Sequence, residues 1–94
     1  MLVVREVFTA KPGQASKLAA MMKAANAAYP AMKGRVLTDY AAQFNTVVLE
    51  AEVADMAEFE RHMHEYQTNA ALRETFKGYT DLWITGRREI YRVV

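Results

Sequence analysis

The chain has 94 residues, a length that suits one domain with a single hydrophobic core. Its 12 Lys and Arg residues nearly balance its 11 Asp and Glu residues, so the net charge is +1 and argues against binding to nucleic acid or an anionic membrane. The absence of cysteine excludes a disulfide scaffold, a thiolate nucleophile and a metal site with cysteine ligands.

Residues 1–94 are expected to form one globular domain. Hydrophobic residues make up 52% of the chain and charged residues 24%, a composition typical of ordered rather than disordered proteins. No apolar run approaches the roughly 20 residues of a membrane span. The start of the chain lacks the basic-then-apolar pattern of a signal peptide. We therefore expect a cytoplasmic protein that has no contact with membranes.

The first half of the chain predicts a strand, a helix and two further strands. Leu2–Thr9 is rich in β-branched residues and indicates a strand. Gln14–Tyr29 carries apolar residues at steps of three and four, which predicts a helix that ends before Pro30. Arg35–Tyr40 and Thr46–Val53 are both extended in character and are separated by a short turn, so we expect an antiparallel hairpin.

The second half predicts a helix and a long final strand. Asp55 and Glu58 have the spacing of a capping box, which marks a helix start. The apolar stripe that follows continues past an expected break near Thr68–Asn69. Leu82–Val94 reads as a strand with a bulge at Gly86. The resulting order, βαββαβ, predicts a ferredoxin-like α+β fold with both helices on one face of a four-stranded antiparallel sheet.

The sheet is predicted to bury both of its faces. An antiparallel sheet with one face in water alternates apolar and polar residues, whereas here Val3 and Val7 oppose Val4 and Phe8. The simplest cover for the face without helices is a second copy of the chain, which predicts a homodimer; a monomer with some exposed valines is the alternative. Residues expected on this dimer face, with ion pairs between the arginines and glutamates, are Arg5, Val48, Glu50, Glu52, Arg88 and Arg92.

Three short motifs carry a resemblance to a known family. They are the strand that runs into Lys11-Pro12-Gly13-Gln14, the helix start Asp55-Met56-Ala57-Glu58-Phe59, and the closing Gly86-Arg87-Arg88-Glu89-Ile90-Tyr91. With them the whole chain resembles the dimeric α/β-barrel superfamily, and its NIPSNAP-like branch most closely. The resemblance implies a homodimer and a cleft between sheet and helices. The superfamily includes cofactor-independent monooxygenases, haem-degrading oxygenases, polyketide cyclases, lactone isomerases and proteins of no known activity, so the reaction stays open.

Five residues are candidates for the lining of such a cleft: Glu6, Tyr40, His62, Tyr66 and Trp83. Glu6 shares the side of its strand with the apolar residues that face the helices, so its carboxylate needs a partner there. His62 is one candidate, and a Glu6–His62 pair would suit proton transfer. The ordinary interpretation of His62 is a hydrogen-bonded structural residue. Each aromatic side chain has a structural alternative too: the two phenols could bond to the backbone, and Trp83 could fill the end of the core.

Metal and RNA sites are not predicted. His62 and His64 diverge by about 200° around a helix, so they cannot hold one metal ion. The strand Thr46–Val53 lacks the aromatic residues that RNA-recognition domains need on this fold.

The sequence leaves three functions open and implies no cofactor. The first is a homodimer that binds a small apolar or aromatic ligand in the cleft. The second is a cofactor-independent monooxygenase in which His62, Tyr66 and Trp83 position the substrate. The third is a non-catalytic interaction module. The third would be favoured if side chains filled the cleft, and the candidates for this are Tyr29, Phe59, Met63 and Phe76.

Overall fold

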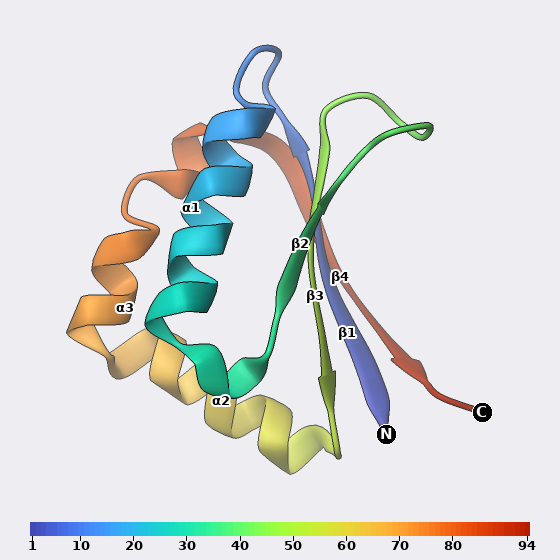
Figure 1. Cartoon of the computed structure of the whole chain (residues 1–94), viewed down its shortest axis with the longest axis vertical. Coiled ribbons are helices and arrows are strands. Elements are labelled where there is room, and N and C mark those ends of the chain that lie inside the picture. Colours follow the sequence, from blue (N-terminus) through green and yellow to red (C-terminus); the bar gives the residue numbers. More distant parts are fainter.

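Four antiparallel strands form one sheet, and the helices cover one of its faces (Figure 1). This computed structural model describes residues 1–94, and its strand order is β2-β3-β1-β4. The predicted ferredoxin-like α+β fold is confirmed, with the second helix divided in two. The strands are β1 (Leu2–Ala10), β2 (Arg35–Thr38), β3 (Thr46–Val53) and β4 (Trp83–Arg92). The helices are α1 (Ala15–Ala28), α2 (Met56–Thr68) and α3 (Ala70–Thr75), with short 3-10 turns at Pro30–Met32 and Tyr79–Asp81.

The ends of the helices follow the capping signals in the sequence. The Asp55 carboxylate accepts a hydrogen bond from the Glu58 amide (2.9 Å), and the Glu58 carboxylate accepts one from the Ala54 amide (2.7 Å). The expected break is present: α2 ends at Thr68, and the Asn69 side chain accepts a bond from the Leu72 amide (3.0 Å), which starts α3. None of the helices is both long enough and apolar enough to span a membrane.

The core lies between the helices and the covered face of the sheet. Strands β1 and β3 supply alternate residues to it, and α1 supplies residues one helical turn apart, as periodicity predicts. The residues with the largest fully buried side chains are Val4, Leu18, Val47, Val53 and Leu72. Met56 is apolar, but it lies in the first turn of α2 and is exposed.

The bulge in β4 lies beside Gly86 rather than at it. The register between β1 and β4 shifts where Thr9 pairs with Thr85 and Ala10 with Trp83, which leaves Ile84 without a partner. Gly86 itself pairs with Phe8, and a Cβ atom there would lie 3.0 Å from the Phe8 ring. The glycine therefore makes room for an aromatic ring instead of accommodating the bulge.

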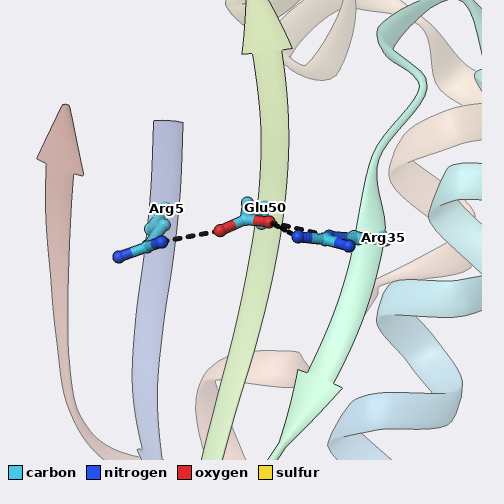
Figure 2. A network of polar contacts seen from close by, with 3 residues as sticks. All are labelled: Arg5, Arg35 and Glu50. Carbon is cyan, nitrogen blue, oxygen red and sulfur yellow. Dashed lines mark hydrogen bonds and ion pairs between the residues drawn. The ribbon is translucent and has the colours of Figure 1, made fainter. Parts of the chain in front are cut away.

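The uncovered face of the sheet carries a three-residue ion network. Figure 2 shows Glu50 of β3 between Arg5 of β1 and Arg35 of β2, its cross-strand neighbours. The Arg5 Nε donates to Glu50 Oε1 and the Arg35 Nε to Glu50 Oε2, both at 2.7 Å. The Glu50 side chain is 8% exposed, so two guanidinium groups compensate one buried carboxylate. These hydrogen bonds, from Arg5 first and Arg35 second, hold the pKa of Glu50 below its ordinary value.

Glu50→Gln is expected to destabilise the fold by about 1–3 kcal/mol at neutral pH, because two charge-assisted hydrogen bonds lose their anionic acceptor. Because the pKa of Glu50 is lower in the folded protein, its ionised carboxylate contributes its full stabilisation above the unfolded-state pKa of about 4.3. That stability is lost as the pH falls through the folded pKa, so the difference between the two proteins should shrink in acid. Urea unfolding at neutral and acidic pH measures it. Glu52→Gln, at an exposed site without an ion pair, is the control, and equal unfolding of both variants would contradict the prediction.

Candidate functional site

A cleft opens between the covered face of the sheet and the helices. Its volume is about 260 Å³, and nine of its 12 lining residues are hydrophobic. Met22, Met32 and Met63 contribute flexible thioethers to the wall, which suits a ligand of irregular outline. Tyr29 and Phe59 do not line the cleft, so the four side chains proposed to fill it leave it open. The interaction-module alternative thus lacks the observation that would have favoured it.

An ion pair between Glu6 of β1 and Arg88 of β4 lies at one end of the cleft. The Arg88 Nε donates a short hydrogen bond to Glu6 Oε1, as expected for residues directly opposite each other on β4 and β1. The guanidinium group of Arg88 also lies 5.1 Å from the centre of the Phe59 ring and 3.7 Å from the Met63 sulfur. These contacts fix the orientation of a half-exposed side chain. The cleft therefore ends in a polar group whose two charges cancel.

Tyr66 brings an unsatisfied phenol to the same cleft. Its side chain lines the cavity, and its hydroxyl oxygen is buried without a hydrogen-bond partner. Burial raises the pKa of Tyr66 above its ordinary value of 10, so the phenol keeps its proton at neutral pH. A buried hydroxyl without a partner is costly, and a ligand that hydrogen-bonds to it would remove this cost.

The proposed Glu6–His62 pair does not form. Glu6 is paired with Arg88, whereas His62 lies on the side of α2 that faces the end of α1. There His62 is buried, with its Nδ1 atom 2.7 Å from the Tyr29 hydroxyl and its Nε2 atom 3.5 Å from Glu58 Oε1. His62 is thus hydrogen-bonded to Tyr29 and does not reach Glu6, whose partner is Arg88 on the neighbouring strand β4.

Two further candidates lie away from the cleft. Trp83 is half-buried against Phe8 and Tyr79, with ring centres 5.4 and 6.3 Å away, and it fills the end of the core. Tyr40 is fully exposed in the loop between β2 and β3. The predicted strand reached Tyr40, but β2 ends at Thr38 because the Asp39 carboxylate accepts a bond from the Thr46 amide (3.0 Å) and closes the turn.

Four of the six residues assigned to the dimer face lie on the uncovered face: Arg5, Val48, Glu50 and Glu52. Arg88 and Arg92 do not, because β4 pairs with β1 in a register that places them opposite Glu6 and Leu2 on the helix side. The residues of β4 on the uncovered face are Thr85, Arg87, Glu89 and Tyr91. The predicted ion pairs of Arg88 and Arg92 with Glu50 or Glu52 are also wrong, since β1 separates β4 from β3.

The cleft also includes residues that were not among the five predicted to line it. Met22 and Met63 belong to the apolar stripes of α1 and α2, and Phe76 and Tyr79 follow α3. Periodicity gave their direction but could not show that space remains in front of them. No three His, Asp or Glu side chains lie close enough together to hold a metal ion.

Solved structures share this fold at low sequence identity. A NIPSNAP family protein from Agrobacterium tumefaciens superposes with a TM-score of 0.84 at 8% identity, covering 99% of this chain and 92% of the other. An uncharacterized NIPSNAP domain protein from Burkholderia xenovorans gives 0.82 at 10% identity, covering 100% and 95%. A putative antibiotic biosynthesis monooxygenase from Chloroflexus aurantiacus gives 0.75 at 12% identity, covering 99% and 92%.

The chain matches no protein-family model and no curated protein sequence. The structural similarity therefore concerns the fold, over nearly the whole length of the chain. It agrees with the resemblance carried by the three sequence motifs. The protein shares the ferredoxin-like fold of these NIPSNAP family proteins.

Proposed function

We propose that this protein is a homodimer that binds a small, largely apolar or aromatic molecule carrying one hydroxyl or carbonyl group. The observation that carries the proposal is the buried, unpartnered Tyr66 phenol in the wall of a mostly apolar cavity. The cavity is smaller than most drug-sized sites and has room for about two fused rings. A neutral ligand is favoured, because Glu6 and Arg88 already neutralise each other at the end of the cleft.

The uncovered face of the sheet supports self-association. It presents Leu37 and Tyr91 with side chains 38% and 49% exposed, beside half-buried Val48. Its charges balance, with three arginines (Arg5, Arg35 and Arg87) and three glutamates (Glu50, Glu52 and Glu89). Five of these six are already paired within the chain: Glu50 with Arg5 and Arg35, and Glu89 with Arg87 at 2.9 Å. Two such faces can meet without like-charge repulsion across about 800 Å² each.

A second candidate function is the oxidation of an aromatic alcohol by dioxygen without a cofactor. The similarity in fold to the putative antibiotic biosynthesis monooxygenase from Chloroflexus favours it, together with the apolar cleft and its phenol donor. In the balanced reaction, one dioxygen supplies the new carbonyl oxygen of a quinone and the oxygen of one released water. We expect oxygen uptake with 2-naphthol that falls in Tyr66→Phe if this reaction occurs. An oxygen electrode measures it, and a bound but unoxidised naphthol would leave binding as the function.

For ligand binding, 2-naphthol is expected to shift the NMR methyl signals of Met22, Met32 and Met63, whose side chains line the cleft. Met1 and Met56 are exposed outside it, so their signals are internal controls. Tyr66→Phe should weaken 2-naphthol binding about fivefold, the equivalent of about 1 kcal/mol for one hydrogen bond. Binding of naphthalene, which has no hydroxyl, should not change. Shifts at Met1 and Met56 alone, or none, would contradict the proposed site.

For self-association, sedimentation at micromolar concentration is expected to give a dimer. Leu37→Glu places an additional charge in the proposed contact and should raise the dissociation constant more than about tenfold. Ala24→Glu on the exposed side of α1 is the matched control and should leave the dimer intact. A monomer at every concentration, or equal dissociation of both variants, would contradict the dimer.

A further inference from the structure

A series of aromatic rings connects the cleft to a second groove. This outer groove is lined by Tyr29 and by residues of α2. Tyr79, Phe76 and Tyr66 line the cleft, with ring centres 5.6 Å apart from Tyr79 to Phe76 and 5.7 Å from Phe76 to Tyr66. Tyr66 contacts Tyr29 edge to face at 5.9 Å, and Tyr29 belongs to the outer groove. Trp83, the only tryptophan, lies 6.3 Å from Tyr79 at the other end. All these spacings are those of rings in contact.

The series ends at a tyrosine with a proton acceptor. The Tyr29 hydroxyl lies 2.7 Å from Nδ1 of His62, and the Glu58 carboxylate lies 3.5 Å from Nε2 of the same ring. A carboxylate near Nε2 favours the tautomer with its proton there, which leaves Nδ1 as the acceptor for the phenol. Burial raises the pKa of Tyr29, so the phenol is protonated at neutral pH, and with this tautomer of His62 it donates the hydrogen bond to Nδ1.

Tyr29 and Tyr66 differ in their hydrogen bonds, and this difference makes Tyr29 the more easily oxidised of the two. A phenol that loses an electron becomes strongly acidic, so its oxidation is easiest where a base takes the proton at the same time. Tyr29 has such a base, whereas the Tyr66 hydroxyl is buried without any partner. No hydrogen bond joins Tyr66 to Tyr29, so an electron can cross between these rings and a proton cannot.

We propose that the rings from Trp83 to Tyr29 are an electron-transfer path through which Tyr29 reduces a one-electron oxidant in the cleft. The oxidant class is an aryloxyl radical, and its place in the cleft rests on the proposed function. The radical takes one electron from the path, becomes a phenolate and is protonated by water. The electron comes from Tyr29, whose proton moves to His62 Nδ1, giving a neutral tyrosyl radical and an imidazolium beside Glu58.

The tyrosyl radical of Tyr29 is reduced back to the phenol in the outer groove. Tyr29 and His62 share this groove with Glu60, Arg61 and Glu65, so it is open to polar molecules in water. An enediol reductant of the ascorbate class donates one electron to the tyrosyl radical there, and His62 returns the proton to the phenol. Across these steps, one aryloxyl radical gains one electron and one proton, and one enediol loses one electron and one proton, with both protons exchanged through water. The protein is unchanged at the end.

Pulse radiolysis with azide radicals tests the path, because they oxidise tryptophan and the chain has a single one. The Trp83 radical is expected to decay at a rate independent of protein concentration as a tyrosyl radical forms. Tyr29→Phe keeps the ring contacts and removes the hydroxyl, so it should slow this transfer about tenfold, the equivalent of about 1.4 kcal/mol. In heavy water the unsubstituted protein should also react more slowly, because a proton moves with the electron.

Tyr40→Phe is the matched control, since Tyr40 is fully exposed in the β2–β3 loop and its substitution should change nothing. Equal rates in Tyr29→Phe, Tyr40→Phe and the unsubstituted protein would overturn the path. The absence of any tyrosyl radical would do the same. The measurement needs no molecule in the cleft, so a failure of ligand binding would overturn the proposed function and leave this result unaffected.

Discussion

The position of β1 between two neighbours is the constraint on which the rest of the structure depends. Because β1 pairs with β3 on one side and β4 on the other, each of its residues is committed to one face of the sheet at a defined place. Glu6 is thereby placed against Arg88 among the helices, and the adjacent Arg5 against Glu50 on the open side. Two ion networks, one residue apart in the sequence, serve two different surfaces.

This separation lets both proposed activities coexist. The cleft lies entirely on the helix side, and the charge-balanced face lies on the other, so a second copy of the chain would not occupy the ligand site. The two faces are nonetheless linked through β1, because its successive residues point alternately to one face and the other.

Tyr66 is the residue at which the two inferences about chemistry meet. Its hydroxyl is buried without a partner, while its side chain lines the cavity and its ring contacts both Phe76 and Tyr29. The hydroxyl is suited to recognising a ligand and the ring to exchanging an electron. In the proposed path His62 acts only through Tyr29, from a buried position outside the cleft.

Local signals determined the elements of this fold. Capping residues such as Asp55 and Asn69 mark where helices begin, and the alternation in β1 separates Glu6 from Arg5. The partners of these side chains were decided by tertiary structure. Arg88 pairs with Glu6 because β4 lies next to β1, and His62 bonds Tyr29 because α2 crosses the end of α1. Periodicity gives the direction of a side chain, but which group it meets depends on strand order and helix crossing, which act between segments far apart in the chain.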